Sequence, residues 1–224
     1  RSEQDRDQLL DALTTTAAPR RIILVGGDPA SPAGPYDDSL ALLRSNLLQR
    51  HAITQVGIVG YPEGHPRIDT STLWRSLRWK LDVLQEAGCT VEITTQYGLD
   101  AEAVVHWIEQ LRREGIDTPV RIGVPGPAKA GTLLRYAQQF GVTPSSAIAC
   151  RYGLPMDDPQ RRVGADRYWD HLMASISGSD LGAIGYHLYP FGGILDGAQW
   201  MNHHIPNPHQ ENRGGGSTDT SRTP

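Results

Sequence analysis

The chain has 224 residues, of which 38% are hydrophobic and 21% charged, with 24 Gly and 16 Pro. This length and balance fit one globular domain with many turns, and they exclude a large multidomain assembly or a mainly disordered chain. The 21 basic and 25 acidic residues give a formal net charge of -4 without a basic stripe, which argues against nucleic acid as a partner. No apolar run approaches the length of a membrane helix, so we expect a soluble protein.

The cysteines and the two ends of the chain indicate the cellular compartment and the extent of the folded domain. Cys89 and Cys150 lie far apart without paired spacing, so the sequence predicts neither a disulfide framework nor a metal site, and we expect a reducing, cytoplasmic compartment. Because the chain starts at Arg1 rather than Met, we expect that this is not the native start. Residues 206–224 are polar and rich in Gly, Ser and Thr, which predicts a disordered tail after a single domain over residues 1–205.

Short apolar runs alternate with longer amphipathic stretches, beginning with a predicted helix over residues 2–13. Strands are predicted over residues 21–27, 55–61, 90–96, 120–124 and 183–188. Helices are predicted over residues 38–49, 70–87, 101–114, 130–140 and 159–177. Because a helix follows each of the first four strands, we expect an α/β fold with a parallel sheet covered by helices.

Two architectures place helices after parallel strands: an open doubly wound sheet and a closed (β/α)8 TIM barrel. The first βα turn reads GGDPAS and lacks the third glycine of GxGxxG, so the barrel is favoured. Only about five of the eight βα units are visible, and we therefore expect the N-terminal part of the barrel to be absent from this chain. The open edge that this leaves would suit a second copy or a partner chain.

Polar, Gly-rich and Pro-rich segments follow the predicted strands: GGDPASPAGPYDD, YPEGHP, TQYGLD, PGPAK and YPFGG. In both parallel architectures the loops at the carboxyl ends of the strands carry the site. Strand termination explains the Gly and Pro residues, but it does not explain Asp28, Glu63, His65 and Gln96. We therefore expect the chemistry to lie at these loops.

The most specific motif is GYPEGHP, over residues 60–66. Together with Gly27–Asp28 and Thr95–Gln96, in the same order and spacing, it resembles the methylenetetrahydrofolate reductase family over roughly residues 20–202. In that family the fifth barrel strand ends in Tyr-Pro-Glu-x-His-Pro, the fourth in Gly-Asp and the sixth in Ile-Thr-Gln. The matching residues of the first element are Tyr61, Pro62, Glu63, His65 and Pro66.

This resemblance implies a flavin-dependent TIM barrel of one-carbon metabolism and methionine biosynthesis. Such an enzyme reduces 5,10-methylenetetrahydrofolate to 5-methyltetrahydrofolate, with FAD as cofactor and NAD(P)H as hydride donor. The protein would supply position and electrostatics, while the cofactor supplies the redox chemistry. A folate is therefore the implied small-molecule partner.

The resemblance also assigns roles at the first two loops. Asp28 is the implied catalytic residue, because a carboxylate at a strand end could stabilise a cationic iminium near the flavin; the alternative is an ordinary turn or helix-capping Asp. Gly27, Asp28, Tyr61 and His65 are the implied FAD contacts. Glu63, between Pro62 and Gly64, fits a site residue and a structural turn residue equally well, and it is left outside the predicted site.

The resemblance assigns roles to four further residues. Lys80 is similar to the family lysine that meets the flavin diphosphate, although a lysine on a helix ordinarily faces solvent. Tyr36 is placed beside the flavin. Gln96 is expected to bind the amide-like edge of the pterin, because a buried amide needs partners. Tyr152 is expected to stack on the folate or, alternatively, to pack in the core.

The chain departs from the family pattern at several points. Gly26 stands where many relatives have Arg, and Gly192 and Gly193 stand where many have a basic residue. The family's catalytic glutamate ends the first barrel strand, which we expect to lie outside this chain, so we expect the chain by itself to bind FAD weakly. The alternative function is a non-catalytic folate- or flavin-binding barrel subunit completed by another chain. A barrel lyase or aldolase would need a lysine at a strand end, and the five predicted ends have none.

Overall fold

The computed structural model describes residues 2–17, 19, 21–26, 34–36, 38–43, 47–139, 149, 152–155 and 157–205. Gly27 and Asp28, Cys150 and the predicted tail at 206–224 lie outside the described residues. Within the described ranges, none of the helices has the length and apolar character that crossing a lipid bilayer requires.

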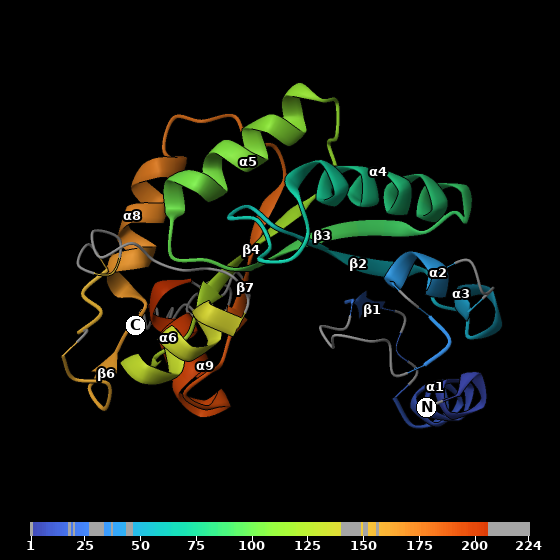
Figure 1. The fold of residues 1–224 in the computed structure, drawn as a ribbon, viewed down its shortest axis with the longest axis horizontal. Helices are drawn as coiled ribbons and strands as arrows, with labels where there is room; N and C mark the ends of the chain where they lie inside the picture. Colours follow the sequence, from blue (N-terminus) through green and yellow to red (C-terminus); the bar gives the residue numbers. More distant parts are fainter. Residues whose placement is uncertain are drawn as a thin grey trace, which may run out of the picture.

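A parallel sheet of five strands organises the molecule (Figure 1). Its strands, in spatial order, are β1 (Arg21–Leu24), β2 (Gln55–Gly60), β3 (Thr90–Tyr97), β4 (Val120–Pro125) and β7 (Ile184–Tyr189). The helices between them are α2 (Ser39–Leu43), α3 (Leu47–Arg50), α4 (Thr70–Glu86), α5 (Ala101–Arg113), α6 (Ala130–Gln139) and α8 (Asp166–Ile176). Helix α1 (Glu3–Ala17) precedes the sheet and α9 (Ile194–His204) follows it.

The strand order follows the chain order. Each strand of the sheet pairs in parallel with the next one along the chain, and only the short antiparallel pair β5 (Ala128–Lys129) and β6 (Arg162–Val163) intervenes before β7. A doubly wound sheet would reverse its strand order at a switch point, and the five described strands have no such reversal. The α/β fold with a parallel sheet is confirmed, and its strand order is the one that a TIM barrel requires.

The predicted strands are all present, but two of the predicted helices differ. Residues 38–49 form two short helices, α2 and α3, rather than one. The predicted helix over 159–177 begins only at Asp166, because the backbone before it bonds to the start of α6: Ala130 N–H donates to Arg161 O and Gly131 N–H to Pro159 O, each at 2.9 Å. The sequence did not predict α9, whose first residues are exposed and present no buried apolar stripe.

One face of the sheet is apolar and covered by helices. Strand side chains alternate between the two faces, and the residues of this face are almost fully buried: Val56, Ile58, Ile93, Val120, Ile122 and Val124. Helix α4 packs on β2 and β3, and α5 packs on α8, as Figure 1 shows for the helices above the sheet. In α5 the buried residues recur at helical spacing, which explains the position of the helix.

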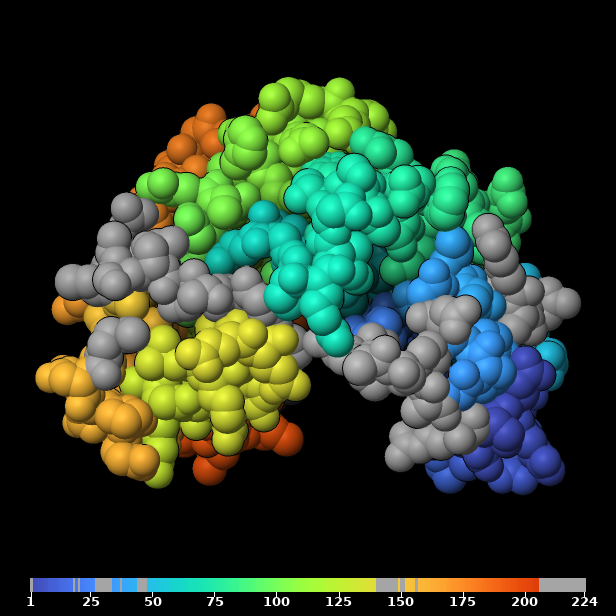
Figure 2. Space-filling view, in the orientation of Figure 1, coloured from blue at the N-terminus to red at the C-terminus, as the bar shows by residue number. Residues whose placement is uncertain are grey.

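The opposite face of the sheet carries a group of charged side chains. Glu92 accepts a hydrogen bond from Arg21 Nη2 at 3.2 Å and forms an ion pair with Arg121, whose Nε lies 2.6 Å from the other carboxylate oxygen. Arg21 and Glu92 meet across β2 at Gly57, which pairs with Ile23 on one side and with Glu92 on the other. Figure 2 shows the blue N-terminal segments and the yellow and orange C-terminal segments on either side of the teal and green centre.

Gly60 offers a test of the packing on the helix-covered face. A methyl group there would lie 2.5 Å from Trp107 and 3.0 Å from Ile93, whereas one on Gly185 in β7 would meet only ordinary contacts at 3.7 Å. We expect Gly60→Ala to lower the free energy of unfolding by about 1–3 kcal/mol through overpacking, and Gly185→Ala to change it by less than about 1 kcal/mol. Urea denaturation measures both; equal effects would contradict this packing.

Candidate functional site

A cavity of about 750 Å³ opens beside the carboxyl ends of the strands. Residues from β1, β2, β3 and β7 line it, together with residues of α2 and α4. Its volume lies within the usual range of about 300–1,000 Å³ for small-molecule sites. Four of the residues singled out from the sequence line it: Tyr61, His65, Lys80 and Gln96.

The turn after β2 brings two aromatic side chains into the cavity. Tyr61 and His65 contact each other edge to face, with ring centroids 5.6 Å apart. Burial raises the pKa of Tyr61 and lowers that of His65, so the phenol and the neutral imidazole are favoured. The backbone N–H of Arg67 donates to His65 Nδ1 at 3.2 Å, which leaves the proton of a neutral imidazole on Nε2.

Gln96 and Thr94 place polar groups on the cavity wall from β3. Gln96 is 8% exposed, and its Nε2 donates to Gly64 O at 3.0 Å, so its amide oxygen is the group suited to accept from a ligand. Thr94 is 2% exposed, and its Oγ1 finds no hydrogen-bond partner among the described residues. A buried hydroxyl without a partner is costly, which makes Thr94 a further candidate for ligand binding.

Lys80 reaches the cavity from α4 and is half-buried. Desolvation lowers its pKa, and the negative charge of Asp38 opposes that shift. Two arginines that the sequence reading did not single out, Arg67 and Arg75, also line the cavity. Their positions could have indicated them, because Arg67 directly follows the GYPEGHP motif and Arg75 lies on the same helix as Lys80.

Strand β7 contributes His187 and Tyr189, which the sequence reading also missed. Tyr189 donates its hydroxyl proton to Thr95 O at 2.9 Å, and burial raises its pKa to about 12. Burial also lowers the pKa of His187, Arg121 lowers it further, and Glu92 opposes the shift. Because side chains alternate along a strand, His187 and Tyr189 share one face of β7, and this pattern could have indicated both.

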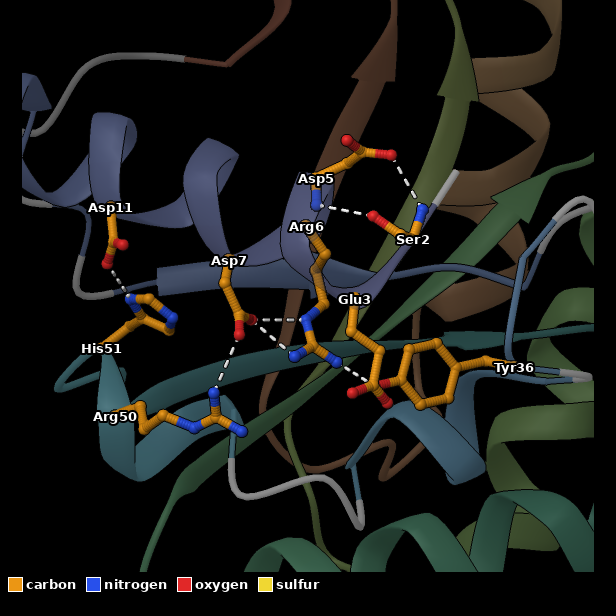
Figure 3. A network of polar contacts seen from close by, with 9 residues as sticks. All are labelled: Ser2, Glu3, Asp5, Arg6, Asp7, Asp11, Tyr36, Arg50 and His51. Carbon is orange, nitrogen blue, oxygen red and sulfur yellow. Dashed lines mark hydrogen bonds and ion pairs between the residues drawn. The ribbon is translucent and has the colours of Figure 1, made fainter.

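Tyr36 lies in a different environment, the polar network that joins α1 to Tyr36 itself and to Arg50 of α3 (Figure 3). Its hydroxyl donates to Glu3 Oε1 at 2.8 Å and accepts from Arg6 Nη1. Arg6 in turn bonds Asp7, which also pairs with Arg50 at 2.8 Å. Tyr36 is not among the residues that line the cavity, so the structure brings it to α1 rather than to the other predicted cofactor contacts.

Tyr152 is also outside the cavity lining and only 3% exposed. Its ring packs edge to face against Tyr168, with centroids 5.4 Å apart, and its hydroxyl accepts from Ala101 N–H at 3.2 Å. Because Ala101 begins α5, Tyr152 satisfies one of the donors that a helix N-terminus leaves open. This placement corresponds to the core-packing alternative for Tyr152.

Gly27 and Asp28, the predicted cofactor contact and catalytic carboxylate, lie outside the described residues. The chain that leads to them, Val25 and Gly26, does line the cavity. The roles of Gly27 and Asp28 therefore stay predictions.

Glu63, which the sequence analysis left outside the site, does not line the cavity and bonds the backbone before α5. Its Oε1 accepts from the backbone N–H groups of Leu99 at 2.8 Å and Asp100 at 3.2 Å. Burial raises the pKa of Glu63 to about 7, and the hydrogen bonds from Asp100 and Leu99 only partly offset that shift. A carboxyl group beside the site thus titrates near neutral pH.

Two known proteins similar to this chain are both named methylenetetrahydrofolate reductases. Methylenetetrahydrofolate reductase 2 of Saccharomyces cerevisiae is 29% identical over 159 residues, which are 66% of this chain and 26% of the relative. Methylenetetrahydrofolate reductase 1 of Schizosaccharomyces pombe is 25% identical over 130 residues, 55% of this chain and 21% of the relative. Over these residues the chain is similar to methylenetetrahydrofolate reductases at modest identity.

The chain spans about a quarter of the length of the curated relatives that it matches. No protein-family model matches it. Among solved structures, a protein from Clostridium thermocellum described as binding two copies of 5-methyl-5,6,7,8-tetrahydrofolic acid aligns with a TM-score of 0.46 and 12% identity. That alignment covers 88% of this chain and 66% of the other.

The pKa of Glu63 predicts a pH-dependent stability. Because folding raises this pKa from 4.5 to about 7, the native state holds the proton more tightly than the unfolded state. The free energy of unfolding should therefore fall as the pH rises from about 4.5 to about 7, by on the order of 2 kcal/mol relative to Glu63→Gln, and level off above that.

Urea denaturation of both proteins between pH 4 and 8 measures this difference. Glu109→Gln, which removes a carboxylate from a half-buried position on α5, is the matched control and should follow the wild-type profile. Parallel profiles for wild type and Glu63→Gln would contradict the prediction.

Proposed function

We propose that this chain carries the flavin- and folate-binding face of a flavin-dependent oxidoreductase that reduces 5,10-methylenetetrahydrofolate to 5-methyltetrahydrofolate with NAD(P)H. The names of the similar reductases support this assignment. The observation that carries it is the meeting of Tyr61, His65 and Gln96 from the two motif segments with Lys80 in one cavity. These residues come from the turn after β2, from β3 and from α4, and they are distant along the chain.

The residues of the cavity fit a flavin nucleotide. Such a ligand needs an apolar, partly enclosed space, hydrogen-bond partners at its ring edge and positive charge near its phosphates. The buried hydroxyl of Thr94 lacks a partner among the described residues and is suited to one of these polar contacts. Lys80 and Arg75 supply positive charge on the same wall.

Within this proposal each side chain has a defined task. The Lys80 ammonium and the Arg75 guanidinium balance the charge of the diphosphate. Tyr61 and His65, held edge to face, pack against the cofactor, and His65 offers an Nε2–H donor. The bound FAD would supply the hydride chemistry between NAD(P)H and the folate.

Gln96 is assigned to the folate. Its amide nitrogen is held by Gly64 O, which orients the amide oxygen for a donor on the substrate. An oriented amide reads the alternating donors and acceptors of a pterin edge better than a mobile one, because less conformational entropy is lost on binding. Asp28 remains our proposal for the carboxylate near the reacting atoms.

A titration of the chain with FAD and riboflavin tests this proposal. We expect both flavins to bind, with quenching of flavin fluorescence, and we expect Lys80→Ala to weaken FAD binding about tenfold while leaving riboflavin, which has no phosphate, unchanged. Lys129→Ala is the matched control, since Lys129 bonds Gln160 and does not line the cavity.

The outcomes of this titration separate the alternatives. Absence of binding by either flavin would contradict the flavin assignment. Equal losses for FAD and riboflavin would contradict the phosphate role of Lys80. Flavin binding without reduction of the bound flavin by NADH or NADPH would favour a non-catalytic binding subunit instead.

A further inference from the structure

The turn that presents Tyr61 and His65 is fixed to its neighbours at two points. Gly64 N–H donates to Tyr61 O at 3.1 Å and closes the turn, and Gly64 has a positive φ of 83° that favours glycine. On one side Gln96 Nε2 donates to Gly64 O at 3.0 Å. On the other side the Glu63 side chain reaches the backbone of the loop before α5.

The contact of Glu63 completes the hydrogen bonding at the start of α5. A helix N-terminus leaves its first N–H groups without partners in the helix. Asp100 Oδ1 accepts from Glu102 and Ala103, each at 3.1 Å, and Tyr152 accepts from Ala101. The N–H groups of Leu99 and Asp100, just before the helix, donate to Glu63 Oε1.

The loop is shaped to admit this carboxylate. A methyl group on Gly98 would overlap Glu63 Oε1, while its other nearest neighbour, Val104 Cγ2, would lie at an ordinary 3.7 Å. Gly98 therefore leaves the space that the Glu63 oxygen occupies. Such complementarity indicates that the contact is a specific feature of the fold rather than a side chain resting on the surface.

We propose that Glu63 is a positioning residue whose side-chain oxygen fastens the Tyr61–Pro66 turn to the start of α5 and thereby holds Tyr61 and His65 in their binding arrangement. This inference rests on the proposed function of the cavity and adds to it a residue that stands between Tyr61 and His65 in the sequence. Glu63 does not line that cavity and acts through the turn.

Among the residues that the structure describes, the charges that face Glu63 are few. Asp100 raises the pKa of Glu63 by its negative charge, and the Glu63 charge in turn contributes to the raised pKa values of Tyr97 and Tyr168. These neighbours are acidic or neutral. The fastening therefore depends on an acceptor oxygen for two N–H donors rather than on an ion pair, and Gln should replace Glu63 better than Ala.

Amide hydrogen exchange followed by NMR tests the fastening without any ligand. We expect Glu63→Ala to speed exchange at Leu99 and Asp100 about tenfold or more, with little change at Ile122 and Val124 in β4. Glu63→Gln, which keeps an acceptor oxygen, should stay within about threefold of wild type. An unchanged exchange rate in Glu63→Ala would overturn the proposal.

A double-mutant cycle with Gly98 supplies a second, independent variant. Gly98→Ala should speed exchange at Leu99 and Asp100 in the wild-type background, because the added methyl displaces the Glu63 oxygen. In the Glu63→Ala background the same change should have almost no further effect, since the overlap is gone. Additive effects of the two substitutions would overturn the assigned contact.

FAD affinity connects the fastening to the site. We expect Glu63→Ala to weaken FAD binding about tenfold, Glu63→Gln to restore most of it, and Glu109→Gln to leave it unchanged. Faster exchange with undiminished FAD affinity in Glu63→Ala would overturn the positioning role. If wild type bound no FAD, the proposed function would fail, while the exchange data would still decide whether Glu63 fastens the turn.

Discussion

Parallel pairing in chain order is the constraint from which the other features follow. Since the five strands run the same way, each following loop leaves from the same edge of the sheet, and segments distant in sequence meet there. Side-chain alternation then separates two environments. Val56, Ile58 and Ile122 enter the helix-covered core, whereas Thr94 and His187 face the side on which the cavity opens.

The cavity wall is held by hydrogen bonds that also serve the fold. Gln96 links β3 to the turn after β2, Tyr189 links β7 to Thr95, and Gly123 N–H donates to Thr95 Oγ1 at 2.8 Å where the β3–β4 register shifts. Gln96 and Tyr189 thus fix neighbouring backbone segments by hydrogen bonds and also line the cavity. Such cross-links reduce the reorganisation that a ligand must induce, which favours binding.

The sequence predicted what local patterns encode and missed what depends on tertiary contacts. Apolar runs located the strands, and the GYPEGHP motif located the turn that carries Tyr61 and His65. The polar network of α1 that holds Tyr36, and the capping of α5 by Tyr152, join segments that no local pattern connects. Glu63 was left outside the site, and its partners Leu99 and Asp100 became visible only in the folded chain.

We propose that segments distant in sequence form one flavin site, and histidine NMR is the direct test. His65 lines the cavity from the turn after β2 and His187 from β7, whereas His171 and His203 lie on α8 and α9 and do not line it. During a titration with FAD, we expect the imidazole signals of His65 and His187 to shift together with one dissociation constant, while those of His171 and His203 stay in place. Shifts confined to His171 and His203, or no shift at His65 and His187 despite bound flavin, would contradict it.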